Sequence, residues 1–499
     1  MTYREIDAQS TRLAATLRAR GVCRGDRVAI FLDNCAEAVV AIFGALKADA
    51  VFVTINPTTK SDKLLFLLND CRAAALITHA LITHARFDTQ AAQAQAPSLR
   101  QTILVGATET PSERQIRWEE AIGPSSPEAS FRRAAIDIDL ATILYTSGST
   151  GLPKGVMMTH LNMVTAATST LQYLENVEDD IIIDCLPLSF GYGLYQPLMA
   201  LKIGATVVLE KAFTYPQLIL QSLDRERVTG FPLVPTMLAM LVKIPHFSGA
   251  HFPHLRYFTN AAAAMPPAHI ATLRERFPKA RLYSMYGLTE CKRVCYLPPD
   301  QIDRRPTSVG RAIPNTEAYV VNAAGERAGV GEVGELVVRG AHVMRGYWER
   351  PEETEQALRL GPLSGERLLH TGDLFKTDDE GFLYFVARQD DIIKTRGEKV
   401  SPKDVEAVLY RMPEVLEAAV VGVSDPVLGE AIRAVIVPVD GASLTAQAVL
   451  RHCARHLEDF MMPKFVEFRK ELPKTATGKI LRREIQMEAA SPSLLETAR

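Results

Sequence analysis

The feature that most constrains the fold is an alternation of short β-branched runs with amphipathic stretches over the first two thirds of the chain. Such alternation is typical of parallel sheets covered by helices. It predicts helices at 36–48 and 62–71, and enough strands for two wound sheets. The expected strands are 27–32, 51–55, 74–78, 140–145, 181–186, 205–209, 229–233, 255–259 and 281–285.

The texture changes near Pro314, where Gly-rich strand and turn patterns without long helices begin. Strands expected at 318–321, 334–339 and 381–387 predict a smaller β subdomain. Beyond a boundary at 388–391, Ser401 and Pro402 start a helix that runs to about residue 411, with Asp404 completing a capping box. Strands at 418–423 and 431–437 and a helix at 446–457 then complete a small α+β unit.

The predicted fold class is therefore α/β, with helices covering the wound sheets of a large N-terminal domain that also carries the β subdomain. We expect this domain to span residues 1–387, a hinge to span 388–391, and a small α+β C-terminal domain to span 392–499.

Composition narrows the classes of partner. The 56 Lys and Arg residues nearly balance the 58 Asp and Glu residues, so no global field draws the chain to nucleic acid or anionic lipid. The most apolar run, 38–55, is interrupted by Lys47 and Asp49 and is too polar for a membrane span. The N-terminus lacks a secretory signal, and seven scattered cysteines form no CxxC pair. We expect a cytoplasmic protein that binds small partners locally.

The sharpest local feature is the segment 145–155, which reads YTSGSTGLPKG between two predicted strands. Its glycines let successive backbone N–H groups face an anion, its hydroxyls add donors, and Lys154 adds a positive charge. The spacing differs from the GxxxxGK[ST] loop of kinases and motor ATPases. A flexible linker is the alternative, which the tight apolar flanks disfavour. The residues predicted to bind phosphates are Thr146, Ser147, Gly148, Ser149, Thr150, Gly151 and Lys154.

Four further motifs follow, at 286–290 (YGLTE), 371–373 (TGD), 388–397 (RQDDIIKTRG) and 473–479 (PKTATGK). With these five motifs in order and at the approximate separations, the chain resembles the adenylate-forming superfamily. This superfamily comprises acyl-CoA synthetases, aryl-CoA ligases, carrier-protein adenylation domains and luciferases. The acyl- or aryl-CoA synthetase type is the nearest expectation. Any single motif could arise by chance, whereas five in register are highly specific.

The resemblance implies roles for the YGLTE residues. Thr289 would hydrogen-bond the α-phosphate of ATP, and Glu290 would hold Mg²⁺, which prefers hard carboxylate oxygens. Gly287 would allow close approach of nucleotide or substrate. Tyr286 would offer an aromatic face to the adenine, although a plain core aromatic is the alternative for this residue.

The later motifs would complete the nucleotide site. By resemblance, the two oxygens of Asp373 match the ribose hydroxyls, and Arg388 adds a donor there. Lys479 would stabilise the charge that develops on the α-phosphate during adenylation. The alternatives are a turn residue for Asp373 and one charge of a basic tail for Lys479.

The resemblance also implies that the C-terminal domain is mobile. Asp390 falls at the family's hinge, about which the domain would rotate between an adenylating and a thioester-forming pose. Gly397 and Lys399 would line the thiol channel in the second pose, and Lys394 lies near family nucleotide contacts. The alternative for Gly397 is an ordinary turn.

The acid pocket is expected to begin at Phe190 and Gly191. Amino-acid-activating members usually carry Asp at the position of Gly191, so an α-amino acid substrate is disfavoured. Many CoA ligases carry His where this chain has Phe190, which leaves the subfamily open. The lining is small or apolar and suits a compact aliphatic or aromatic acid, although the alanines could be plain packing. It comprises Phe190, Gly191, Tyr192, Phe231, Asn260, Ala261, Ala262, Ala263, Ala264, Met285 and Val294.

The expected activity is ATP-dependent conversion of a carboxylic acid into an acyl-adenylate and pyrophosphate, followed by transfer of the acyl group to coenzyme A. The required cofactors are ATP, Mg²⁺ and coenzyme A. An enzyme that loads the phosphopantetheine arm of a carrier protein is the second reading, and a non-catalytic nucleotide-binding paralogue is the third. Retention of Lys154, Glu290, Asp373 and Lys479 argues against the third.

Overall fold

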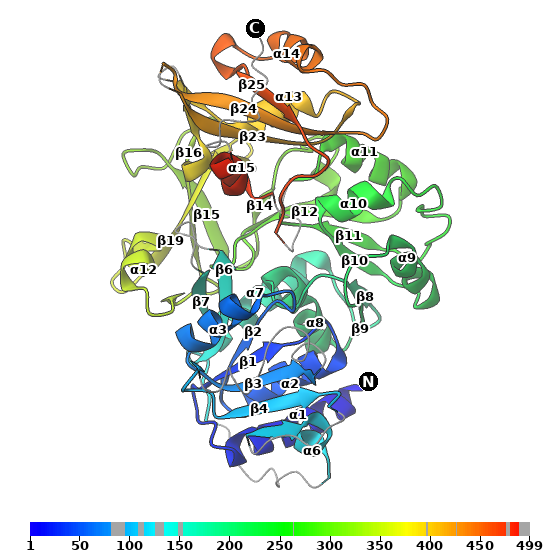
Figure 1. The fold of residues 1–499 in the computed structure, drawn as a ribbon, viewed down its shortest axis with the longest axis vertical. Helices are drawn as coiled ribbons and strands as arrows, with labels where there is room; N and C mark the ends of the chain where they lie inside the picture. The colour runs from blue at the N-terminus through cyan, green and yellow to red at the C-terminus, as the bar shows by residue number, and fades with distance from the viewer. Residues whose placement is uncertain are drawn as a thin grey trace.

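The computed structural model describes residues 1–80, 95–107, 114–124, 134–147, 153–262, 264–395, 398–425, 427–475 and 480–488. Within these ranges the strands form four sheets. Figure 1 shows the sheet of the first strands at one end of the molecule, the C-terminal sheet at the other, and the two remaining sheets between them. The α/β class predicted from the sequence is confirmed.

The first sheet has eight strands and a parallel centre, because its apolar runs are buried on both faces. Its strands β6 (Leu140–Ser147) and β7 (Pro153–Thr159) pair antiparallel, and they contain the two described ends of the Ser/Thr/Gly-rich segment 145–155. The helices α1 (Tyr3–Ala19), α2 (Ala36–Lys47), α3 (Ser61–Asp70), α6 (Trp118–Ile122) and α7 (His160–Leu174) accompany it. In spatial order the strands are β17 (Gly346–Tyr347), β7 (Pro153–Thr159), β6 (Leu140–Ser147), β2 (Val51–Thr54), β1 (Arg27–Phe31), β3 (Ala73–His79), β4 (Gln101–Val105) and β5 (Gln115–Arg117).

The second sheet has seven strands, of which β12 to β9 are parallel and β13 and β14 antiparallel. In spatial order they are β14 (Arg311–Ala312), β13 (Cys295–Leu297), β12 (Arg281–Tyr286), β11 (Tyr257–Asn260), β10 (Gly230–Leu233), β8 (Ile181–Asp184) and β9 (Thr206–Leu209). Its helices are α8 (Gly191–Ile203), α9 (Pro216–Arg225), α10 (Pro235–Leu241) and α11 (Pro267–Arg276), with the 3-10 turn η1 (Pro299–Gln301) after β13. The two predicted wound sheets are therefore present.

The third sheet is antiparallel, as predicted for the β subdomain. It contains β15 (Thr316–Val321), β16 (Gly334–Gly340), β19 (Arg367–Thr377), β18 (Leu358–Leu360) and β20 (Leu383–Arg388), with the short helix α12 (Pro351–Ala357). The strands β19 and β20 pair Asp373 with Arg388, which brings two of the predicted motifs face to face.

The fourth sheet belongs to the C-terminal residues. It contains β22 (Glu398–Val400), β21 (Ile393–Thr395), β24 (Gly429–Pro438), β23 (Val415–Asp425) and β25 (Phe465–Phe468). Around it lie α13 (Pro402–Leu409), α14 (Ala446–Ala454), α15 (Arg482–Glu488) and the turn η3 (Asp459–Met461). Its two hydrophobic clusters draw only on residues from Ile393 onward. The division at 387, 391 and 392 stays a prediction.

The start of α13 differs from the expected capping box. Ser401 is the N-cap and its hydroxyl accepts a hydrogen bond from the Lys403 amide, but within the described residues Asp404 returns none. The Ser401 hydroxyl instead donates to the carbonyl of Val386 at 2.8 Å, in the strand β20. This bond ties the first turn of the C-terminal helix to the β subdomain.

No helix within the described ranges is both long enough and apolar enough to cross a bilayer.

Candidate active site

The site is built around the carboxyl end of β12, at an edge where parallel sheets commonly bind ligands. After Tyr286 the chain makes a tight loop and returns as β13, closed by a 2.9 Å hydrogen bond from the Val294 amide to the Tyr286 carbonyl. A Cβ on Gly287 would overlap the carbonyl oxygen of Lys292. Glycine is therefore required here by the fold of the loop itself, whatever else approaches it.

The Asp373 carboxylate is the meeting point of three predicted residues. It is buried, and one oxygen accepts a hydrogen bond from the Tyr286 hydroxyl at 2.5 Å, while the other accepts one from Arg388 Nε at 3.1 Å. Burial and the Asp373 charge raise the pKa of Tyr286 well above its usual value, so the phenol stays a donor. The carboxylate thus faces Tyr286 and Arg388, and Asp373 itself lies within the strand β19.

The Tyr286 ring is held by two phenylalanines of the β subdomain. Its centroid lies 4.9 Å from that of Phe375 in an edge-on arrangement and 6.4 Å from that of Phe385. Aromatic packing of this kind fixes the plane of the ring.

Glu290 is connected to the phosphate-loop hairpin through Tyr347. The Tyr347 hydroxyl donates to Glu290 Oε1 at 2.8 Å, and the ammonium of Lys154 lies 5.7 Å from the centre of the Tyr347 ring. Lys154 also lies 3.8 Å from a carboxylate oxygen of Glu353. Tyr347 reaches this position because β17 pairs with β7, the strand that follows the loop. Sequence reasoning missed Tyr347, since neither charge nor motif spacing marks it.

The residues fit a magnesium ion of the kind that nucleotides bring with them. Among the described residues no group of three or more His, Cys, Asp or Glu side chains could hold a metal. Mg²⁺ in nucleotide enzymes is usually bound by one or two carboxylates together with substrate phosphates. The half-buried Glu290 carboxylate, with Tyr347 bound to one oxygen, supplies one such ligand. Thr289, the residue before Glu290, makes no side-chain hydrogen bond within the described part of the chain.

Side-chain hydrogen bonds hold Tyr145, the first residue of the predicted phosphate-binding segment 145–155. The Tyr145 hydroxyl donates to Asp70 at 2.5 Å, and Arg350 pairs with the same carboxylate at 2.8 Å. Thr146 faces Lys154 across the β6–β7 pair. Ser147 closes β6, but nothing of its side chain is described, and Gly148, Ser149, Thr150 and Gly151 lie outside the described residues.

The C-terminal candidates are only partly covered. Asp390 lies in the 3-10 turn η2 (Gln389–Asp391) between β20 and β21. Lys394 is exposed on β21 and pairs with Lys399 on β22, whose side chain is not described. Gly397 and Lys479 lie outside the described residues. An isolated bridge between Lys474 and Ile480 joins the two sides of the final motif.

Four of the predicted acid-pocket residues are buried in or next to the strands of the second sheet. Asn260 ends β11 and Met285 lies one residue before the end of β12, whereas Phe231 is the second residue of β10 and Val294 directly precedes β13. Ala261 is buried and Ala262 exposed, and Ala262 adopts a left-handed φ of 73° that is uncommon for a residue with a side chain. Ala264 is exposed, and Ala263 lies outside the described residues.

The remaining acid-pocket residues begin α8. Phe190 is its N-cap, and Gly191 and Tyr192 form its first turn. The Tyr192 hydroxyl lies 2.6 Å from Thr259 Oγ1, which joins this turn to β11.

Two charged residues directly before Val294 change the character of this wall. Lys292 and Arg293 are only 7% and 2% exposed. The Lys292 ammonium donates to the Gly191 carbonyl and lies 4.3 Å from the centre of the Tyr195 ring, and the Arg293 guanidinium lies 5.0 Å from that of Tyr192. Burial, aided by Arg293, holds the pKa of Lys292 well below its ordinary value. Two buried charged residues therefore contact the predicted lining residues, and the expectation of few polar handles did not include them; that lining stays a prediction.

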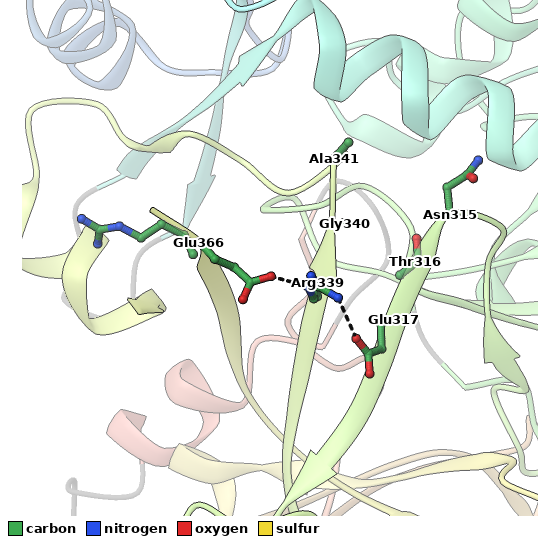
Figure 2. A pocket seen from close by; sticks show the side chains of 8 residues that line it. Asn315, Thr316, Glu317, Arg339, Gly340, Ala341 and Glu366 are labelled. Carbon is green, nitrogen blue, oxygen red and sulfur yellow. Dashed lines mark hydrogen bonds and ion pairs between the residues drawn. The ribbon is translucent and has the colours of Figure 1, made fainter. Parts of the chain in front are cut away.

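A separate pocket of about 500 Å³ lies between β15, the end of β16 and the start of β19 (Figure 2). Arg339 crosses it to pair with Glu317 and Glu366. None of the predicted site residues lines it. Its lining residues are Asn315, Thr316, Glu317, Arg339, Gly340, Ala341, Glu366 and Arg367.

Comparison with known families assigns most of the chain. Residues 1–348 match the AMP-binding enzyme family, and residues 404–479 match the AMP-binding enzyme C-terminal domain.

Individual relatives agree along nearly the whole chain. A long-chain-fatty-acid–CoA ligase of Salmonella typhimurium is 33% identical over 98% of this chain and 90% of its own length. A feruloyl-CoA synthase of an Amycolatopsis species is 34% identical over 97% and 93%. Each alignment covers at least nine tenths of both proteins, so the similarity is not confined to one domain.

Solved structures give the same result. ATP-bound MatB from Rhodopseudomonas palustris superposes with a TM-score of 0.87 at 28% identity, over 97% of this chain and 93% of that one. The o-succinylbenzoate CoA synthetase of Bacillus subtilis, in complex with the acyl-adenylate intermediate OSB-AMP, gives a TM-score of 0.84 at 28% identity, over 99% and 94%. A benzoate CoA ligase from Burkholderia xenovorans gives 0.86 at 28%, over 97% and 94%.

Proposed function

This chain belongs to the AMP-binding enzyme family as an AMP-forming carboxylic acid–CoA ligase, and from that premise we propose how its residues divide the reaction. The enzyme uses ATP to convert a carboxylic acid into an acyl-adenylate with release of pyrophosphate. It then transfers the acyl group to the thiol of coenzyme A.

In the first half-reaction a carboxylate oxygen of the acid attacks the α-phosphorus of ATP. A new P–O bond forms, the bond to the bridging oxygen of the β-phosphate breaks, and pyrophosphate leaves with the electron pair. Negative charge accumulates around the α-phosphorus, so donors and cations held there lower the barrier. We assign this work to Thr289, Lys479 and the hydroxyl and glycine cradle that ends in Lys154.

The nucleotide would be positioned by the shared carboxylate of Asp373, and this is the observation that supports the proposal most. Tyr286 and Arg388 each take up one lone pair of its oxygens, and each oxygen has another available for a ribose hydroxyl. The residues come from three motifs far apart in the sequence. A structural ion pair alone would not need the Tyr286 ring held in place beside it.

Mg²⁺ would be bound by Glu290 together with the phosphates, and it would neutralise charge on the leaving pyrophosphate. Tyr347 keeps the Glu290 carboxylate oriented through its 2.8 Å hydrogen bond. Lys154, which packs on the Tyr347 ring, keeps a cation on the same side of the nucleotide.

In the second half-reaction the sulfur of the thiol attacks the acyl carbon, the C–O bond to AMP breaks, and the thiol proton leaves to solvent. We propose that the C-terminal domain turns at Asp390 so that Gly397 and Lys399 meet the pantetheine arm, with Lys394 near the nucleotide. A carrier-protein arm presents the same thiol, and it remains the second candidate acceptor. The setting we propose is the cytoplasm, which fits seven cysteines that all remain free thiols.

The test is pyrophosphate release from Mg-ATP with a panel of short-chain, branched, long-chain and aromatic acids. We expect release with at least one acid, followed by a CoA thioester when CoA is added. If ATP binds but every acid fails to release pyrophosphate, the chain is a nucleotide-binding paralogue instead. Mass spectrometry after adding CoA or a pantetheinylated carrier protein to a productive acid identifies the acceptor.

A further inference from the structure

The loop after β12 carries a pair of buried cations that the reaction chemistry does not use. Lys292 and Arg293 lie two and three positions after Glu290, and their side chains contact residues that are predicted to line the acid pocket. Lys292 is bound to the Gly191 carbonyl, and Arg293 lies on the face of Tyr192.

These cations lack anionic partners. No described carboxylate lies within ion-pair distance of either residue, and Arg293 Nε has no hydrogen-bond partner among the described residues. The charge of Asp184 acts to raise the pKa of Lys292, but this carboxylate is fully buried. One of its oxygens accepts a hydrogen bond from the Leu186 amide at 3.1 Å, and the other has no hydrogen-bond partner in the described part of the chain. Burying an unpaired charge is costly, and in the free protein this cost lowers the pKa of Lys292. An anion bound beside Lys292 and Arg293 would offset the cost and favour the protonated lysine.

The backbone gives a second, independent sign. Lys292 is held at a φ of 64°, in the left-handed region that a lysine adopts only at a cost. Strained conformations of this kind persist where the surrounding fold imposes them, and they cluster at ligand-binding positions. A glycine would relieve the strain but would remove the ammonium.

The polarity of this wall follows from its contacts. Gly191 has no side chain, and its carbonyl receives the ammonium of Lys292. The complementary group on a substrate is then an anion rather than a cation.

From these observations we propose that Lys292 and Arg293 recognise a second carboxylate on the acid, so that the preferred substrates of this ligase are dicarboxylic acids. One carboxylate reacts at the α-phosphorus beside Thr289 and Glu290, and the other binds the two cations. This inference rests on the proposed function, since it specifies the substrate class of the same site.

The test compares matched acids on the wild-type enzyme, namely adipate with hexanoate, suberate with octanoate, and terephthalate with benzoate. The readout is kcat/KM for pyrophosphate release. We expect the diacid to exceed its monoacid by at least about tenfold in one or more pairs, because a monoacid leaves the buried cations unpaired.

The variant Lys292→Met keeps the length of the side chain and removes its charge, and Arg293→Gln keeps a donor. Each should abolish most of the diacid preference, while the ratio for Lys202→Met, an exposed lysine of α8, stays at the wild-type value. The ratio within one variant is insensitive to partial loss of folded protein, and thermal unfolding with ATP present checks that each variant folds.

Monoacids turned over as well as or better than their diacids by the wild-type enzyme would overturn this inference and leave the ligase activity intact. An undiminished preference in Lys292→Met and Arg293→Gln would also overturn it. Failure of every acid to release pyrophosphate would instead overturn the proposed function, and this inference with it.

Discussion

Residues 286–290 and residues 292–294 lie on two sides of one cysteine, yet their side chains are partnered in opposite ways. In the first stretch Tyr286 and Glu290 have protein partners in Asp373 and Tyr347. In the second, Lys292 and Arg293 are more deeply buried but meet only a carbonyl and aromatic faces. The comparison indicates that the site for ATP, which every turnover uses, is already arranged in the free protein. The neighbouring site for the acid has buried positive groups that only the acid would pair.

Among the changes at residues assigned to the nucleotide, we expect Lys479→Ala to have the largest effect on the reaction rate. Loss of a cation from the charge that develops at the α-phosphorus should slow adenylate formation by roughly 100-fold to 1,000-fold. Thioester formation from supplied acyl-adenylate and CoA should be largely spared. Rapid-quench measurement of each half-reaction separates the two, and an equal loss in both would refute the assignment.

A change at Asp373 should affect the binding of ATP without affecting the binding of the acid. Asp373→Asn removes the charge that faces Tyr286 and Arg388, and we expect the KM for ATP to rise by roughly tenfold to 100-fold. The KM for the acid should stay unchanged, and Lys292→Met should show the reverse pattern. Steady-state kinetics with each substrate varied in turn gives both values. A parallel rise of both constants in Asp373→Asn would show that the two sides are not independent.

Gly287→Ala should disturb both stretches together. The added methyl group meets the Lys292 carbonyl, so the loop must shift, at a cost of about 1–3 kcal/mol in unfolding free energy. Both KM values should then rise, in contrast to the selective effects above. Gly381→Ala, at a position with a left-handed φ but no neighbour in the way, is the matched control for a glycine replacement that strains backbone alone.

The free energy of unfolding should depend on pH through His342, which lies next to the backbone of Arg293. Burial lowers the pKa of His342 from 6.5 to about 4, and the nearby Arg293 backbone offsets only part of this. The unfolded chain binds a proton below pH 6.5, whereas the folded chain binds it only near pH 4, so stability is lost as the pH falls between these values. From pH 7 to pH 5 this costs about 2 kcal/mol. We expect the variant His342→Gln, measured by urea unfolding at both pH values, not to show that loss of stability.

The smallest effect concerns Tyr347. Tyr347→Phe keeps the ring beneath Lys154 and deletes only the hydrogen bond to Glu290, so we expect Mg²⁺ to be needed at about tenfold higher concentration. The ATP requirement at saturating Mg²⁺ should be nearly normal. Titration of the adenylation rate with Mg²⁺ measures this, and an unchanged curve would remove Tyr347 from the site.

Much of the fold follows from the sequence because buried strands leave a clear apolar signature. The runs at β1, β2 and β3 are continuous and β-branched or apolar, and their expected limits agree with the structure to within a residue or two. Short strands such as β17 and β21 were not predicted, since two or three residues carry no periodicity. They are defined by pairing with distant strands, as Tyr347 pairs with Val156.

The site divides along the same line. Tyr286, Asp373 and Arg388 could be named because motifs mark them, and the structure brings them together. Lys292 and Arg293 could not, because charged residues in a loop are ordinarily read as solvated. Only the burial of the loop under α8 and the tyrosines reveals their position.

The most direct test of the account is a crystal structure of the enzyme with a non-hydrolysable acyl-sulfamoyl adenosine. We predict that the ribose hydroxyls lie within hydrogen-bond distance of the Asp373 carboxylate, with the adenine against Tyr286 and the sulfamoyl group beside Thr289 and Glu290. A nucleotide bound elsewhere, with Asp373 still engaged only by Tyr286 and Arg388, would contradict the account.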